Sequence, residues 1–148
     1  MSTNLLVYSD RALPKLPSLR LWVGKQIIEA EMAVTPRELA TGMMYRTNIA
    51  ENEGMLFRMP FPQQANFYMK NTVVPLSCAY IDAEGTILEI HDLQPLNETP
   101  VPSASDNIQY VLETAQGWFQ RNSIDAGTVI RTADGPLSEV FVRKRRGL

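Results

Sequence analysis

Cysteine and histidine are nearly missing from this 148-residue chain, which has one of each, Cys78 and His91. A single cysteine excludes an intramolecular disulfide, so cysteine usage says nothing about the redox compartment. Structural zinc sites take most of their ligands from these two residue types, and a zinc site is therefore not expected. A carboxylate site for a hard cation would need regularly spaced acids in a loop, and the sequence has no such loop. We expect no metal and no cofactor.

Long apolar runs are also missing. No stretch approaches the roughly 20 apolar residues that cross a bilayer, so no membrane span is expected. Near the N-terminus the apolar run is only Leu5-Leu6-Val7, and a secretory signal needs roughly 7–15 such residues. The chain is therefore expected to be cytoplasmic, or to be an exported protein given without its leader.

No excess of positive charge is present to attract nucleic acid. The 14 lysines and arginines are balanced by 16 aspartates and glutamates, for a formal net charge of −2. The sequence also lacks a glycine-rich loop before a helix, which argues against nucleotide binding through a Rossmann or P-loop device. One basic cluster, residues 143–146, is interpreted as a solvated tail, with contact to an acidic partner as the alternative. We expect no nucleic-acid partner.

What the sequence does contain is a series of short segments in which apolar residues alternate with polar ones, the period of half-buried β-strands. Residues 19–23 and 28–34 alternate in this way on either side of a Gly24-Lys25 turn, and they predict a hairpin. Further strands are predicted at 54–59, 66–71, 76–82, 86–92, 108–112, 129–130 and 140–142.

Two short helices are predicted. The first starts at Thr35-Pro36-Arg37-Glu38, where Thr35 caps the first amides and Glu38 completes a capping box. Met43 and Met44 continue the apolar stripe of this helix and are expected to fill the core rather than to line a ligand site. Thr114 is expected to cap the second helix, whose aromatic residues 118–119 face the core.

The segments 76–82 and 86–92 form the clearest hairpin, and its register decides which side chains share a face. With a two-residue turn, Cys78 lies on the same face as His91. With a three-residue loop and Gly85 in a left-handed bulge, Ser77 lies with His91 instead, and Cys78 turns toward apolar residues. The second register keeps each face chemically uniform and is therefore preferred.

About seven or more short strands, two short helices and frequent turns are typical of mainly β proteins. We predict a single-domain β-sandwich or partly open barrel, because no βαβ alternation is visible. The domain is expected to cover residues 19–142, between an N-terminal arm of residues 1–18 and a basic C-terminal tail of residues 143–148. Residues 94–107, rich in proline, serine and asparagine, predict a long surface loop.

Several short motifs follow one another in a specific order. They are Thr35–Glu38, Gly42-Met43-Met44-Tyr45-Arg46, Gly54–Phe57, Phe67–Thr72, Pro75-Leu76-Ser77, Asp82–Gly85, Tyr110–Glu113 and Gln116-Gly117-Trp118. Over roughly residues 28–131 the chain resembles a family of small prokaryotic proteins, many of them exported, catalogued as domain of unknown function 192. The resemblance implies a β-sandwich in a bacterial-type protein and no established activity. Met43 stands for the family's leucine, Tyr68 for its tryptophan and Ser77 for its aspartate, and only the last change removes a charge.

Lys70, Asn71 and Thr72 stand side by side where a predicted strand ends. An ammonium, an amide and a hydroxyl together suit a carboxylate, a phosphate or a sugar oxygen. Arg46 and Glu113 are the other charged residues in the family motifs, and a ligand-binding site would form if all five converge. In the structural alternative, Lys70 pairs with Glu113, while Asn71 and Thr72 bond to the turn backbone.

Cys78 and Ser77 are the candidate nucleophiles. Cys78 needs a base within hydrogen-bond reach, and the preferred register turns it away from His91, so a buried free thiol is expected. Ser77 would lie beside His91, with Glu89 or Asp92 to orient the ring, but no nucleophile-elbow motif surrounds it. We therefore assign no catalytic residue.

Three functions remain open. The first is a β-sandwich that binds a small molecule or a peptide through Lys70, Asn71 and Thr72. The second is a hydrolase-like enzyme in the same cleft, in which Glu113 is the general base and Lys70 stabilises negative charge. The third is a protein-interaction module without a pocket. A concave cluster of the five residues favours the first two functions, and a strongly raised pKa of Glu113 favours the enzyme.

Overall fold

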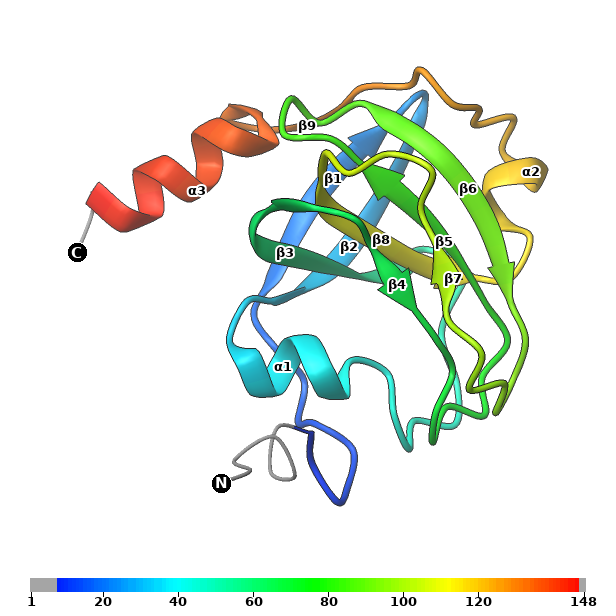
Figure 1. Cartoon of the computed structure of the whole chain (residues 1–148). Coiled ribbons are helices and arrows are strands. Elements are labelled where there is room, and N and C mark those ends of the chain that lie inside the picture. Colours follow the sequence, from blue (N-terminus) through cyan, green and yellow to red (C-terminus); the bar gives the residue numbers. More distant parts are fainter. Residues whose placement is uncertain (1–7, 147–148) are drawn as a thin grey trace.

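The computed structural model describes residues 8–146, with side chains up to residue 141. This part of the chain contains ten strands and three helices (Figure 1). The strands are β1 (Ser18–Val23), β2 (Gln26–Ala33), β3 (Glu53–Gln63), β4 (Asn66–Phe67), β5 (Leu76–Ile81), β6 (Ile87–Leu93), β7 (Val101–Pro102), β8 (Ile108–Ala115), β9 (Ile130–Thr132) and β10 (Gly135–Pro136). The helices are α1 (Pro36–Thr41), α2 (Trp118–Arg121) and α3 (Leu137–Arg146).

Eight strands form one curved sheet in the order β10-β9-β1-β2-β3-β8-β5-β6, and β4 pairs with β7 in a separate two-stranded sheet (Figure 1). The curvature brings the start of β6 to the segment before β9. There the Ile87 amide donates to the Thr128 carbonyl at 2.8 Å, and the Ile130 amide donates to the Gly85 carbonyl at 2.9 Å. In the described chain no full ladder joins β6 to β9, so the barrel stays partly open. The mainly β, single-domain fold expected from the sequence is confirmed.

The central strands are buried on both faces. Leu56, Ala79 and Leu112 pack in one hydrophobic cluster together with Trp118 and Phe119 of α2. Because side chains alternate along a strand, their neighbours in sequence point the other way, and Phe57, Cys78 and Val111 belong to a second cluster. Residues of α1, of the turn after it and of the segment 65–74 cover this second face.

One pair of neighbouring strands is parallel. β2 and β3 run in the same direction, and α1 lies between them in the chain. The described chain has no repeated βαβ alternation, as the sequence indicated, but the sequence did not reveal this single parallel pair. The predicted capping box is present, with the Glu38 amide 3.2 Å from Oγ1 of Thr35, but α1 is only six residues long. Such a short helix leaves almost no periodic signal between two strands.

The strand predicted over 66–71 ends at Phe67. Lys70 and Asn71 form a turn in which Asn71 has a φ of 55°, a left-handed conformation that asparagine tolerates better than most residues. The Asn71 carbonyl accepts a hydrogen bond from the Tyr45 amide at 2.8 Å. The segment after α1 therefore holds this turn, through a contact that no local sequence pattern reveals.

The preferred register of the β5–β6 hairpin was also wrong. Cys78 lies opposite His91, Ser77 lies opposite Asp92, and the pairing is irregular between Tyr80 and Ile81. All six residues of β5 are buried. Because both faces of β5 pack in the core, chemical uniformity of a face was not a valid criterion for its register.

Two predictions near the C-terminus failed. The strand expected at 140–142 is part of α3, in which Leu137 and Val140 are buried at helical spacing. The second helix begins at Trp118 after Gly117, and not at Thr114, because Thr114 still belongs to β8. The backbone of the basic cluster, residues 143–146, is helical, and its side chains lie outside the described residues.

Candidate functional site

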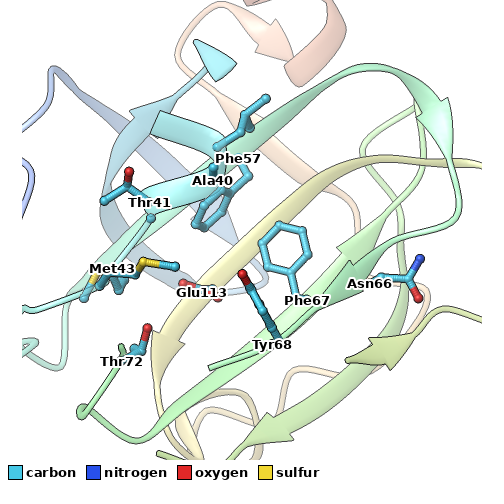
Figure 2. A pocket seen from close by; sticks show the side chains of 12 residues that line it. Ala40, Thr41, Met43, Phe57, Asn66, Phe67, Tyr68, Thr72 and Glu113 are labelled. Atoms are coloured by element: carbon cyan, nitrogen blue, oxygen red, sulfur yellow. The ribbon is translucent and has the colours of Figure 1, made fainter. Parts of the chain in front are cut away.

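A pocket lies between α1 with its following turn and the segment 66–72, above the second cluster (Figure 2). Its volume is about 150 Å³. Figure 2 shows Glu113 of β8 between Met43 on one side and the rings of Phe67 and Tyr68 on the other. The other lining residues are Leu39, Ala40, Thr41, Gly42, Met44, Phe57, Asn66 and Thr72.

Glu113 is the unusual residue of this pocket. It lies in β8, two residues before the end of the strand, opposite Met55 of β3 and Cys78 of β5, and is 4% exposed. Within residues 8–146 no hydrogen bond or ion pair reaches its carboxyl group. Burial raises the pKa of Glu113 to about 8, because the charged form would lose its hydration. At neutral pH the carboxylic acid is therefore mostly protonated and can both donate and accept a hydrogen bond.

The end of α1 shapes one wall of the pocket. Gly42 terminates the helix with a φ of 48°, which favours glycine. A Cβ atom at this position would lie only 2.9 Å from Cζ of Phe57. The glycine of the Gly42–Arg46 motif thus lets the helix end close to the Phe57 ring, which brings both into the pocket lining.

The structure brings together some of the five predicted site residues. Thr72 and Glu113 both line the pocket. Asn71 lies beside it, and its side-chain amide donates to the Tyr45 hydroxyl at 3.0 Å. The Thr72 hydroxyl donates to the Lys70 carbonyl at 2.9 Å, as the structural alternative expected.

Lys70 and Arg46 are not among the pocket-lining residues. The Lys70 ammonium lies 5.4 Å from the ring centroid of Tyr8, and a hydrogen bond with Tyr8 raises the pKa of Lys70. In the described chain it makes no ion pair with Glu113. Arg46 makes two hydrogen bonds with the Glu31 carboxylate, at 2.5 and 2.9 Å. Both cations are thus engaged elsewhere.

Sequence reasoning missed the aromatic walls of the pocket. Phe57, Phe67 and Tyr68 were treated as parts of strands, although all three lie in family motifs. Met43 and Met44 are buried as expected, but both also line the pocket. The usable signal was the clustering of the motifs on one face of the sheet, and that requires the register of β3, β5 and β8.

The two candidate nucleophiles have structural partners. Cys78 is fully buried between Glu113 and His91 in the sheet register, and burial raises the pKa of its thiol, so it is not nucleophilic at neutral pH. Ser77 does not lie beside His91: its hydroxyl donates to Oδ1 of Asp92 at 2.8 Å and accepts from the Gly117 amide at 2.9 Å. His91 instead contacts Glu89, with Nε2 and Oε1 2.9 Å apart.

Replacing Ser77 with aspartate, the residue that the family pattern favours, is expected to destabilise this chain by about 2 kcal/mol at pH 7. Ser77 is 1% exposed, and a second carboxylate there would face Asp92 without the bridging proton of the hydroxyl. Urea unfolding measures the loss. The double variant with Asp92→Asn should recover most of it, and equal stability of S77D and wild type would contradict the explanation.

The described residues contain neither a metal-binding cluster nor a membrane-spanning helix. No group of three or more histidine, cysteine, aspartate or glutamate side chains in them is arranged to hold a metal ion. None of the helices they form is long and apolar enough to cross a membrane.

Comparison with known proteins places the chain in a family. The model of DUF192, described as "Uncharacterized ACR", matches residues 20–132, most of the chain. The chain belongs to the DUF192 family. No curated protein matches this DUF192 chain.

Two solved structures share the DUF192 fold described above. A protein from Sinorhizobium meliloti 1021, named as a candidate transcription regulator, has 29% identity and a TM-score of 0.77 over 82% of this chain and 98% of its own. A protein of unknown function from Novosphingobium aromaticivorans DSM 12444 has 31% identity and a TM-score of 0.75 over 81% of this chain and 90% of its own.

Proposed function

We propose that this DUF192 protein binds a small molecule, or one end of a larger ligand such as a peptide, in the pocket above Glu113. An engineered cavity of about 150 Å³ is large enough to bind benzene, so the pocket volume suits a group of roughly six heavy atoms. The lining combines apolar and aromatic side chains with the polar groups of Thr41, Asn66, Tyr68, Thr72 and Glu113, and ligand sites join both kinds of group.

The observation that carries the proposal is the Glu113 carboxyl group, which lines the pocket, is only 4% exposed and has no partner among the described residues. Leaving a buried polar group unpaired costs about 1–3 kcal/mol, and such groups are rare unless a ligand or water satisfies them. An apolar residue at position 113 would stabilise the fold better. Residues that cost stability are retained where function needs them. The turn with Lys70 and Asn71 would then contact only the part of a ligand that extends beyond Thr72.

An enzyme is the second candidate, and the raised pKa of Glu113 favours it. A carboxyl group with a pKa of about 8 is suited to donate or accept a proton near neutral pH. The Lys70 ammonium, expected to stabilise negative charge beside it, lies against Tyr8 and outside the lining. The binding function therefore has the stronger support.

Amide chemical shifts in NMR spectra test the proposed binding. The probes are butylammonium, 1-butanol and butyrate, which have similar size and different charge. At least one should cause saturable shifts at Gly42, Phe67 and Thr72. Ala40→Leu, which adds bulk inside the lining, should abolish these shifts. Ala50→Leu makes the same change at an exposed position outside the lining and should leave them intact. If none of the probes causes saturable shifts, the proposed function fails.

A further inference from the structure

The charge pattern of the pocket is one-sided. Among the described residues that line it, Glu113 is the one carboxylate, and no lysine, arginine or histidine is present. Of the three lining hydroxyls, two already have protein partners: Thr41 accepts from the Ser9 amide at 2.8 Å, and Thr72 donates to the Lys70 carbonyl. The third hydroxyl, of Tyr68, and the Asn66 amide are neutral groups. The Glu113 oxygens are thus the strongest acceptors available to a ligand. An anionic ligand would meet this carboxyl group without any cation to compensate.

The walls suit a cation as well. The ring centroids of Phe57 and Phe67 are 4.9 Å apart, and the two rings are nearly perpendicular. Tyr68 follows Phe67 in the chain and lines the same pocket. Figure 2 shows Phe67 and Tyr68 beside Glu113, with Met43 opposite. Aromatic faces attract ammonium groups, more strongly when water is excluded, and aromatic cages commonly bind alkylated ammonium ions.

Resting on the proposed function, we infer that the pocket recognises an organic ammonium group, with the Glu113 carboxylate as its counter-ion and the rings of Phe57, Phe67 and Tyr68 as its walls. The pocket volume admits the ammonium and about four carbons. A free alkylamine and the side chain of a lysine in a peptide both present this chemistry.

Binding of an ammonium ion is coupled to loss of a proton. Glu113 is protonated in the empty pocket near neutral pH, and only its carboxylate pairs with the cation, so the proton leaves to solvent. Cys78 and Tyr80 of β5 interact electrostatically with Glu113, and Tyr68 shares the pocket with it; burial keeps Cys78 and Tyr80 neutral. With the pKa of Glu113 at about 8, the fraction of the protein in which Glu113 is ionised rises roughly tenfold from pH 6 to pH 7. The apparent affinity for the ammonium ion rises by the same factor.

Isothermal titration calorimetry with the full chain tests the inference. Butylammonium should bind at least tenfold more tightly than 1-butanol or butyrate. Titrations at pH 7 in two buffers of different ionisation enthalpy should show release of about one proton per ligand. Glu113→Gln should remove both the preference and the pH dependence. Ala40→Leu, which leaves Glu113 in place, should block all binding.

The outcomes separate this inference from the proposed function. If 1-butanol or butyrate binds as tightly as butylammonium, or if Glu113→Gln retains the preference, the ammonium inference is overturned and the pocket remains a binding site. If no probe binds, both fall. To distinguish the two sources, N-acetyl-lysine methylamide is compared with its norleucine counterpart: tight binding of the lysine compound indicates a peptide ligand, and binding of butylammonium alone indicates a free amine.

Discussion

Glu113→Gln is expected to abolish a pH dependence of stability that lies between pH 4.5 and about 8. In the folded protein burial raises the pKa of Glu113 to about 8 from an ordinary value of 4.5. Between these values the folded state keeps its proton and the unfolded state has lost it. The contribution of protonated Glu113 to the free energy of unfolding is therefore fully present below pH 4.5 and is lost as the pH rises to 8.

The size of this effect follows from the shift. Each pH unit between 4.5 and 8 lowers the free energy of unfolding by about 1.4 kcal/mol, so the loss over the whole interval is about 5 kcal/mol. Urea unfolding of wild type and E113Q at pH 5, 6, 7 and 8 measures it: the difference in unfolding free energy should change in favour of E113Q with each unit. Glu84→Gln, at an exposed turn position, should retain the wild-type pH dependence. A difference between wild type and E113Q that stays constant with pH would mean that the carboxyl group is not isolated.

Arg46→Ala is expected to destabilise the protein by about 2–3 kcal/mol at pH 7. Arg46 and Glu31 are only 16% and 14% exposed, and they meet through two charge-assisted hydrogen bonds. Oε1 of Glu31 also accepts from the Leu16 amide at 2.8 Å, and Arg46 reaches the Leu13 carbonyl at 3.4 Å. Removing the guanidinium leaves a mostly buried carboxylate without its counter-ion and loosens the arm before β1.

A double-mutant cycle with Glu31→Gln isolates the pair. Burial alone would raise the pKa of Glu31, but hydrogen bonds from Arg46 and the Leu16 amide outweigh it and lower the pKa below its ordinary value. The pair therefore stabilises the fold above the unfolded pKa of about 4.5 and loses this effect as the pH falls through the lowered value. Additive losses in the cycle at pH 7 would show that the two groups act independently.

Sequence reasoning was most accurate where local chemistry decides the structure. The β1–β2 hairpin and the capping box at Thr35 depend on neighbouring residues, and both are present. Glu113 shows where such reasoning fails. The sequence placed it at a helix entry because Thr114 resembles a cap, whereas β8 continues past it between β3 and β5. Only long-range pairing buries this carboxyl group.

The sequence predicted only part of the candidate site, because tertiary contacts decide which motif residues reach the pocket. Family motifs pointed to Thr72 and Glu113, which share the pocket. They pointed equally to Arg46 and Lys70, whose partners, Glu31 and Tyr8, are distant in sequence. A charge in a motif does not reveal whether its partner is a ligand or another part of the chain. The fold decides this by tertiary contacts.

The two-part construction of the pocket has a consequence for motion. Its floor is a central strand that is paired on both sides along most of its length. Apart from Phe57 of β3, its walls belong to a six-residue helix with the turn after it, and to a two-residue strand with the segment after it. Short elements with few backbone bonds open at low free energy, whereas central strands open only with global unfolding. Amide hydrogen exchange should therefore be fast in α1 and β4 and slow around Glu113, so that a ligand enters by opening of the walls while the sheet stays intact.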